Sequence, residues 1–411
     1  MDALIDIVCV SHLGWDWVWQ RPQQLLSRLA AEGHRVLYVE EPRIEIGPPW
    51  EGFEVTDAGA GVEVARLTLR SDHDTFWSRI DETRDAQGGQ PFDISPDITR
   101  GTLMFQSRFQ PWLEREVAAH VAEWRRGPLA LWLYTPLVAS FIDLVEPDAV
   151  VYDVMDDLSA FRFAPSRLRE QEQYLLERAD LVFAGGPSLH RSVVDRRPDA
   201  HLFPSGVDAA HFARALGDDL EVPGEVAPLA RPVVGFIAVV DERTDLELLD
   251  AVAALRPDVT WVLVGPVLKI KQSALPRQAN LHYIGQQPYE RLPAFLRSFD
   301  VAMMPFAIND ATRSISPTKT LEYLAAGKPV VSTPVPDVIE LYGSMVRVAA
   351  TPDEFVAAVD AALHEPDEAR EQRAVTSREV LTRYSWDAIV AAMGDLLEER
   401  LRTARGAALA E

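Results

Sequence analysis

The sequence predicts an α/β fold with two domains, each built on a doubly wound parallel sheet. Three observations indicate this. The chain has 411 residues, which is long for one core and fits two domains of about 150–200 residues each. Short apolar runs rich in Val and Ile alternate with amphipathic segments, as strands and helices do in such sheets. A stretch rich in Gly, Pro and Asp near residues 213–231 interrupts the alternation and predicts a linker.

The first domain opens with a strand, a helix and a second strand. Residues 5–10 are apolar, residues 21–33 carry leucines on one face of a helix, and residues 36–39 return as a strand. Residues 71–97 are mostly polar and predict an unstructured excursion over the surface. Further strands are predicted at 63–67, 130–134, 149–152, 181–184 and 201–203, with helices at 110–125, 136–145, 166–178 and 187–196.

The second domain repeats the alternation after the linker. Pro and Gly punctuate the changes between elements. Its strands are predicted at 233–239, 260–264, 281–284, 301–305, 329–332 and 345–348, with helices at 245–255, 289–298, 318–326, 336–342 and 352–364, and a final helix at about 385–403.

Charge and cysteine content limit the function classes. The formal net charge of −23 argues against a nucleic-acid partner. Cys9 is the single cysteine, which leaves no disulfide framework or zinc cluster and fits a reducing cytoplasm. The N-terminus lacks signal-peptide features, and no apolar stretch is long enough to span a membrane. We therefore expect a cytoplasmic, bacterial protein with at most peripheral contact at the inner face of the cell membrane.

The segment at 316–331 is the most informative motif. Two N-cap residue types flank a proline at its start, so free backbone N–H groups there predict an anion site. A lysine adds positive charge, and a glutamate lies one turn further along the same face. Phosphate and ribose hydroxyls would suit this layout, whereas the alternative is a capped surface helix that binds nothing. The candidate residues are Ser316, Pro317, Thr318, Lys319 and Glu322.

The whole string, Ser-Pro-Thr-Lys-Thr-Leu-Glu-Tyr-Leu-Ala-Ala-Gly-Lys-Pro-Val-Val, resembles the donor-nucleotide motif of GT-B glycosyltransferases, in particular the retaining family 4, or group 1. In that motif Glu322 takes the place of the second glutamate of E-x7-E, which binds the ribose. The first glutamate falls at Ser314, so the match covers the nucleotide half and leaves the sugar half incomplete. The resemblance implies two Rossmann-like domains facing a cleft, at 1–213 and 225–384, with the helix at 385–411 crossing back to the first.

Donor contacts are also expected at the ends of other strands in the second domain. Arg243 could bind a diphosphate in two places at once, although a surface pair with Glu242 or Asp245 is the alternative. The resemblance implies that the loop after residues 281–285 holds the base, and that residues 307–316 line the sugar and phosphate pocket. The residues predicted for these two roles are Gly285, Gln286 and Tyr289 for the base, and Arg313 for the sugar and phosphate.

Three tryptophans, Trp15, Trp17 and Trp19, lie within five residues after the first strand. Aromatic faces stack on sugars and indole N–H groups reach hydroxyls, so a carbohydrate or lipid-linked sugar acceptor is expected here. The alternative is that Trp17 and Trp19 pack between strand and helix. The string Trp-x-Arg-Pro-Gln-Gln resembles a subset that includes teichuronic-acid and exopolysaccharide enzymes. The candidates are His12, Trp15 and Arg21 for the acceptor, and Gly14 for close approach to the donor phosphate.

Three carboxylates, Asp153, Asp156 and Asp157, follow the strand at 149–152. Carboxylates this close repel one another, which suits a group that accepts a proton from a sugar hydroxyl. Asp157 is the first choice for this catalytic role, with Asp156 and Asp153 behind it. The alternatives are a helix N-cap at Asp156 or Asp157, or a magnesium site.

Together these features predict a glycosyltransferase that moves a sugar from a nucleoside diphosphate sugar to a hydroxyl acceptor in cell-surface polysaccharide or glycolipid synthesis. A UDP-sugar is favoured over a GDP-sugar, and retention over inversion. No cofactor and no metal are expected to be required. A GT-B-fold epimerase or phosphorylase, or a non-catalytic nucleotide-sugar-binding partner protein, are the alternatives.

Overall fold

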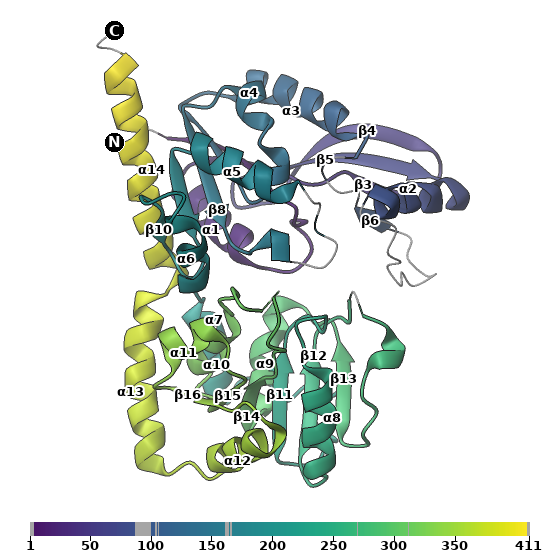
Figure 1. Ribbon diagram of the computed structural model, residues 1–411, viewed down its shortest axis with the longest axis vertical. Helices are drawn as coiled ribbons and strands as arrows, with labels where there is room; N and C mark the ends of the chain where they lie inside the picture. Colours follow the sequence, from purple (N-terminus) through teal and green to yellow (C-terminus); the bar gives the residue numbers. More distant parts are fainter. Residues whose placement is uncertain are drawn as a thin grey trace. The chain divides into compact units, whose positions relative to one another are not determined.

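The computed structural model describes residues 4–86, 100–102, 105, 107–160, 164, 167–268, 270–310 and 312–408. The chain divides into two compact units (Figure 1). Unit 1 holds Met1–Gly185, Leu189–Phe203 and Ile389–Glu411, and unit 2 holds Gly186–Ser188 and Pro204–Ala388. Each unit has its own sheet and its own hydrophobic core. The predicted α/β class with two Rossmann-like sheets is confirmed, while the predicted domain boundaries stay a proposal.

The sheet of unit 1 has the order β10-β9-β8-β7-β1-β2-β5-β3-β6, with β4 paired to β5. β1 lies centrally and pairs in parallel with β2 on one side and β7 on the other. The strands are β1 (Asp6–Val10), β2 (Arg35–Val39), β3 (Arg43–Ile46), β4 (Trp50–Asp57), β5 (Val62–Ser71), β6 (Arg100–Thr102), β7 (Leu129–Leu133), β8 (Ala149–Val154), β9 (Leu181–Ala184) and β10 (His201–Leu202).

The region after β5 differs from its prediction. An α-helix, α2 (His73–Ala86), stands where an unstructured excursion was expected. Asp72 directly precedes this helix, and its carboxylate accepts the backbone N–H of Thr75 at 2.9 Å. The helix buries Phe76. One buried aromatic among many polar residues gives a weak helical period, which explains the error. β4 was not predicted either, and forms a long antiparallel ribbon with β5 (Figure 1). Residues 87–97 of the predicted excursion lie outside the described residues.

The helices of unit 1 follow the predicted order. α1 begins with a capping box between Gln20 and Gln23 and has proline in its first turn. α14 packs against α1, since Gly394 lies close to Leu29, and its Arg400 pairs with Asp180. The elements are α1 (Arg21–Ala31), α3 (Gln110–Trp124), η1 (Pro136–Val138), α4 (Phe141–Val145), η2 (Leu158–Ala160), α5 (Leu168–Arg178), α6 (Pro187–Val194) and α14 (Trp386–Ala408).

The sheet of unit 2 is parallel, with the order β13-β12-β11-β14-β15-β16. Its strands are β11 (Val233–Ile237), β12 (Thr260–Val264), β13 (Leu281–Gly285), β14 (Val301–Met304), β15 (Val330–Ser332) and β16 (Val346–Val348). Its helices are α7 (Ala209–Ala213), η3 (Arg214–Leu216), α8 (Leu246–Leu255), η4 (Gln272–Ala274), η5 (Tyr289–Arg291), α9 (Leu292–Ser298), α10 (Lys319–Ala325), α11 (Pro336–Tyr342), α12 (Pro352–Leu363) and α13 (Asp367–Arg383).

α13 was not predicted, because nearly half of its residues are charged and it shows no clear apolar face. A buried ion network holds it instead. Arg373 pairs with Glu365 at 2.8 Å and donates to the carbonyl oxygens of Gly327 and Lys328 at 3.2 and 3.1 Å. Burial opposes ionisation of Glu365, but the hydrogen bonds and charges of Arg373 and Arg347 outweigh it and lower its pKa. Long-range contacts of this kind leave no local pattern in the sequence.

Gly265 packs the carboxyl ends of three strands together. Its backbone φ is +148°, and a Cβ there would lie 1.8 Å from the carbonyl oxygen of Ala238, which follows β11. Its N–H donates to the carbonyl oxygen of Gly285 at 2.9 Å. Only glycine fits this position, so β11, β12 and β13 end close together.

Within the part of the chain that the structure describes, no helix has the length and apolar character that crossing a membrane requires.

Candidate functional site

α10 lies at the point where the strand order of unit 2 reverses. β11 has β12 on one side and β14 on the other, so the loops after β11 and β14 leave in opposite directions. Two side chains fix α10 above these strands. The buried Tyr323 hydroxyl accepts the N–H of Ile237 at 2.8 Å, and the Thr320 hydroxyl lies 3.4 Å from the sulfur of Met304. Open α/β sheets bind ligands at such reversal points, and the predicted donor motif lies at one.

Lys319 and Glu322 form an ion pair on α10. The Lys319 Nζ lies 2.9 and 3.1 Å from the two carboxylate oxygens of Glu322, whose side chain is only 10% exposed. The predicted capping differs from the observed one, since Thr318 is the N-cap residue but its hydroxyl donates to Glu322 at 3.3 Å. α10 has seven residues. In so short a helix, the ammonium of Lys319, more than the helix dipole, is what this segment can offer an anion.

The residues before this pair lie along the same segment. Ser316 packs against Gly186, where an added Cβ would come within 2.6 Å of the Ser316 Cβ. The carbonyl oxygen of Pro317 accepts the N–H of Thr320 at 3.3 Å, and that of Thr318 accepts the N–H of Glu322 at 3.1 Å. The segment thus turns directly into the helix and carries Lys319 and Glu322 side by side.

Arg243 lies in the loop after β11 and is held by Asp241. Its Nε is 3.0 and 3.1 Å from the two carboxylate oxygens, and its Nη2 is 2.7 Å from one of them. Asp241 is 2% exposed, so the pair is partly buried. Asp245, an expected partner of Arg243, caps α8 by accepting the N–H of Leu248 at 2.8 Å. The charge of Arg243 is thus largely balanced, and Asp241 is a site residue that the sequence reasoning missed.

The loop after β14 is joined to the Arg243 loop by backbone pairing. Thr244 and Phe306 form an antiparallel bridge, and the N–H of Ala307 donates to the carbonyl oxygen of Arg243 at 2.8 Å. The predicted residue Arg313 lies apart from this contact, since its side chain is 76% exposed and pairs with an exposed Asp310 at 3.2 Å.

The residue that orders the loop after β14 is Thr312, which the sequence reasoning did not select. Thr312 is fully buried, and its hydroxyl accepts the N–H of Asn309 at 2.9 Å. The amide of Asn309 in turn donates to the carbonyl oxygen of Glu242 at 3.1 Å. The structure therefore brings the loops after β11 and β14 together next to α10.

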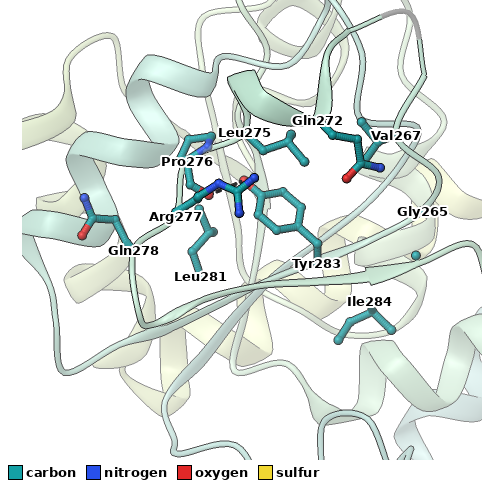
Figure 2. Close-up of a pocket in the computed structure, with 11 residues that line it drawn as sticks. Gly265, Val267, Gln272, Leu275, Pro276, Arg277, Gln278, Leu281, Tyr283 and Ile284 are labelled. Carbon is teal, nitrogen blue, oxygen red and sulfur yellow. Dashed lines mark hydrogen bonds between the residues drawn. The ribbon is translucent and has the colours of Figure 1, made fainter. Parts of the chain in front are cut away.

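A cavity of about 490 Å³ lies beside β13 (Figure 2). Gly265 and Gly285 line it at the strand ends, and Leu275 and Pro276 line it from the segment before β13. Tyr283 faces this segment and its hydroxyl donates to the carbonyl oxygen of Pro276 at 3.3 Å (Figure 2). Burial raises the pKa of Tyr283 to about 12, so the phenol stays a hydrogen-bond donor at neutral pH. The predicted base-binding Gly285 is thus next to a cavity.

The other two predicted base-binding residues have different surroundings. Gln286 is exposed after β13. Tyr289 stacks on His211, with ring centroids 4.2 Å apart and planes 8° apart, and its carbonyl oxygen lies 3.1 Å from the His211 Nε2. One face of the Tyr289 ring is therefore occupied by His211, which no local motif indicated.

The three aspartates of unit 1 do not form one cluster. Asp153 is fully buried and pairs with Arg21, whose Nε lies 3.0 and 2.9 Å from the two carboxylate oxygens. Arg21 also donates to the carbonyl oxygen of Phe203 at 2.9 Å. Asp156 and Asp157 lie half-buried before η2, where Asp157 accepts the Ser159 hydroxyl at 2.6 Å. The pair explains the burial of Asp153 and Arg21 without a ligand, while Asp157 is accessible. Among the described residues, no three side chains are grouped as metal ligands.

The loop that carries Trp15, Trp17 and Trp19 follows β1, at the point where the strand order of unit 1 reverses. The alternative in which Trp17 and Trp19 pack between strand and helix is wrong, because these two are 44% and 38% exposed while Trp15 is 7% exposed. Trp15 is the one that packs, with its ring 5.0 Å from that of Tyr38.

Two other residues predicted in this loop are His12 and Gly14. His12 is half-buried in the same loop. The carbonyl oxygen of Gly14 accepts the amide of Gln23 at 3.2 Å. A Cβ on Gly14 would make only ordinary contacts, 3.7 Å from the nearest side chain, so glycine is not required there.

The comparisons with known proteins agree with this geometry. Residues 243–395 match the family described as "Glycosyl transferase-like". The chain is 25% identical over 254 residues to the putative teichuronic acid biosynthesis glycosyltransferase TuaH of Bacillus subtilis. The aligned region covers 57% of this chain and 63% of that relative, so the chain spans less than two thirds of its length.

Several solved structures share the fold over almost the whole chain. A UDP-forming α,α-trehalose-phosphate synthase of Burkholderia vietnamiensis has a TM-score of 0.66 at 16% identity, covering 98% of this chain and 99% of that one. The E. coli trehalose-6-phosphate structure with bound UDP-2-fluoro glucose has a TM-score of 0.65 at 13% sequence identity, and the match covers 96% of this chain and 99% of that one. Anabaena HepE, in complex with UDP and glucose, has a TM-score of 0.64 at 15% sequence identity, and the match covers 95% of this chain and 99% of that one. The chain therefore has the fold of these glycosyltransferase structures across nearly its whole length. Over residues 243–395 its sequence resembles the glycosyl transferase-like family.

Proposed function

We propose that this chain is a glycosyltransferase that moves a sugar from a UDP-sugar to a hydroxyl group of a carbohydrate or lipid-linked sugar. The observation that carries the proposal is the Lys319–Glu322 pair on α10, which lies at the strand reversal of unit 2 and inside the matched residues 243–395. The UDP and UDP-sugar in the E. coli and Anabaena structures support the choice of donor. The name of the Bacillus relative, a putative teichuronic acid biosynthesis glycosyltransferase, supports a role in cell-surface polysaccharide synthesis. We place the reaction in the cytoplasm and include glycolipid acceptors.

Unit 2 supplies the donor chemistry in this proposal. When the bond between the sugar C1 and the diphosphate oxygen breaks, its electron pair stays on the leaving UDP. The ammonium of Lys319 stabilises this developing negative charge, because its side chain is only 23% exposed and is little screened by water. Glu322 accepts hydrogen bonds from the ribose hydroxyls. Arg243, paired with Asp241 as Lys319 is with Glu322, supplies a second cation.

Unit 1 supplies the acceptor chemistry. The acceptor oxygen forms the new bond to C1 and loses its proton. We favour retention at C1, as in family 4, in which case the departing phosphate oxygen takes the proton and Asp157 orients the hydroxyl. With inversion, Asp157 takes the proton itself, since its carboxylate is accessible and is held by Ser159. Asp153 serves in neither case, because it is buried against Arg21.

The donor half is tested by calorimetric titration of UDP and GDP into the protein. UDP should bind more tightly than GDP, and Glu322→Ala should weaken UDP binding by at least about tenfold, the loss of one good charged hydrogen bond. Glu247→Ala is the matched control, because Glu247 is an exposed glutamate in the first turn of α8. Equal UDP affinity in wild type and Glu322→Ala would overturn the assignment of the ribose site.

The reaction is tested by following the anomeric protons of UDP-glucose by NMR, with and without glycoside acceptors. The proposal expects UDP release that depends on an acceptor, with an α-linked product if configuration is retained. A changed sugar from the donor alone would indicate an epimerase. UDP-sugar binding without any turnover would indicate a non-catalytic partner protein.

A further inference from the structure

We propose that Trp17 and Trp19 form a platform that binds a neutral pyranose ring of the acceptor, with the carboxylate of Asp16 accepting hydrogen bonds from its hydroxyls. The inference rests on the proposed function, which requires an acceptor sugar, and assigns its recognition to a loop in unit 1. Packing between strand and helix was the alternative for both tryptophans, and their exposure of 44% and 38% is the observation that leads to the proposal.

The platform lies where a ligand of this sheet is expected. Its loop follows β1, which pairs with β2 on one side and β7 on the other. The strand order therefore reverses at β1, and the loop stands at the carboxyl end of the sheet. The N–H groups of Ser11 and Tyr134, directly after β1 and β7, donate to the carbonyl oxygens of Val39 and Val10. The base of the loop is thus part of the sheet.

A buried network holds the loop in one shape. The carboxylate of Glu40, a residue 3% exposed, accepts the N–H of Trp15 at 2.5 Å and the Nε of Arg66 at 2.6 Å. Arg66 also donates to Asp16 at 2.7 Å. The amide of Gln23, on α1, donates to the carbonyl oxygens of Gly14 and Trp15. A loop fixed before binding loses less conformational entropy when the ligand arrives.

The ring of Trp19 is held by aromatic contacts that lead to the core. Tyr38 is fully buried, the ring of Trp15 stands edge-on to it at 5.0 Å, and the ring of Trp19 stands edge-on to Trp15 at 5.8 Å. Exposure rises along this series from 0% to 7% to 38%. Trp19 is therefore an oriented ring with accessible surface, and Trp17 lies two residues before it at a turn closed by its N–H and the carbonyl oxygen of Gly14.

The size and charge of the platform fit a sugar better than other occupants. If a tryptophan offers about 250 Å², the two rings expose about 200 Å² together, far below the roughly 800 Å² of a stable protein partner. Glu40, Asp16, Arg43 and Arg66 form a balanced set of charges, which favours a neutral ligand. The carboxylate of Asp16 is 60% exposed and would repel an anionic lipid surface. Aromatic faces with an adjacent hydrogen-bond acceptor suit the mixed C–H and hydroxyl surface of a pyranose.

The test is saturation-transfer NMR with the methyl glycosides of glucose, galactose and N-acetylglucosamine as probes, on the full chain. At least one probe should bind, and the Trp17→Ala/Trp19→Ala double variant should bind it at least about tenfold more weakly. The Trp17→Phe/Trp19→Phe variant should recover part of the affinity. Trp50→Ala is the matched control, because Trp50 lies on β4 with the same 38% exposure as Trp19.

The outcomes separate this inference from the proposed function. UDP affinity is measured on every variant, and should equal that of wild type if the double variant is folded. Undiminished glycoside binding by the double variant, or no binding of any probe by wild type, would overturn the platform while leaving the donor site in place. Loss of binding to phosphatidylglycerol vesicles by the double variant would assign the two rings to a lipid surface instead. Glycoside binding without UDP binding would preserve the platform and contradict the glycosyltransferase proposal.

Discussion

Asp153→Asn should destabilise unit 1 strongly. The carboxylate of Asp153 and the guanidinium of Arg21 have side-chain exposures of 0% and 1% and meet through two contacts of 3.0 and 2.9 Å. Asparagine removes the negative charge and leaves Arg21 charged and buried, with the carbonyl oxygen of Phe203 and the sulfur of Met393 beside it. Breaking one side of a buried ion pair costs about 3–5 kcal/mol of unfolding free energy.

Calorimetric unfolding measures this effect. In a domain of about 150–250 residues, each kcal/mol lowers Tm by roughly 2–4 °C, so we expect a decrease of about 6–20 °C in the transition of unit 1. Replacing both charges, in Arg21→Met/Asp153→Leu, should recover most of the loss because no unpaired charge remains.

The matched control for the buried aspartate is Asp157→Asn. Its amide oxygen can still accept the Ser159 hydroxyl, so Tm should change little while turnover falls. If Asp153→Asn unfolds within about 2 °C of wild type but has lost turnover, the pair adds little stability and Asp153 acts in the chemistry, contrary to our reasoning.

Two further predictions concern unit 2. Gly265→Ala should lower the free energy of unfolding of unit 2 by about 3 kcal/mol or more, because the added Cβ would lie 1.8 Å from the carbonyl oxygen of Ala238. The control is Gly224→Ala, whose Cβ would meet nothing within 4 Å and which should leave the unfolding free energy nearly unchanged. Chemical denaturation of both variants measures the difference. Burial lowers the pKa of Lys328 to about 8. Between that pH and about 10.4 the unfolded chain keeps a proton that the folded chain has lost, so the free energy of unfolding should rise with pH, by up to about 3 kcal/mol. Urea unfolding of wild type and Lys328→Met at about pH 7.5, 9 and 10 checks this, and an equal pH slope in both would contradict it.

The order of strands and helices could be predicted because most strands are buried on both faces and read as short apolar runs. Val233–Ile237 and Thr260–Val264 are fully buried and were found within one or two residues at each end. The elements that were missed are those stabilised by polar contacts between distant residues. α13 depends on Arg373 reaching Glu365 and the carbonyl oxygens of Gly327 and Lys328, and the residues of an ion network do not reveal their partners in the sequence.

In the candidate site, too, the sequence predicted local features but not contacts between residues that are distant in the chain. The motif at 316–331 is local, so the adjacency of Lys319 and Glu322 on one helical face followed from their spacing. The burial of Asp153 depends on Arg21, which is 132 positions away, and no local rule connects them. Among the three tryptophans, the sequence showed their aromatic character but not which one would pack against Tyr38.

Under the proposed function, the Lys319–Glu322 pair also explains why a nucleoside diphosphate would bind better than a nucleoside alone. In the structure the two charges satisfy one another at 2.9 Å. A nucleoside that drew the Glu322 carboxylate toward its ribose would weaken the pair with Lys319 in a partly buried place, which costs free energy. A nucleoside diphosphate replaces both halves of the pair at once, because its phosphates take over Lys319 while its hydroxyls take over Glu322. Under the proposed function, binding of the two parts of the donor is therefore coupled through one ion pair, and that coupling favours the intact nucleoside diphosphate.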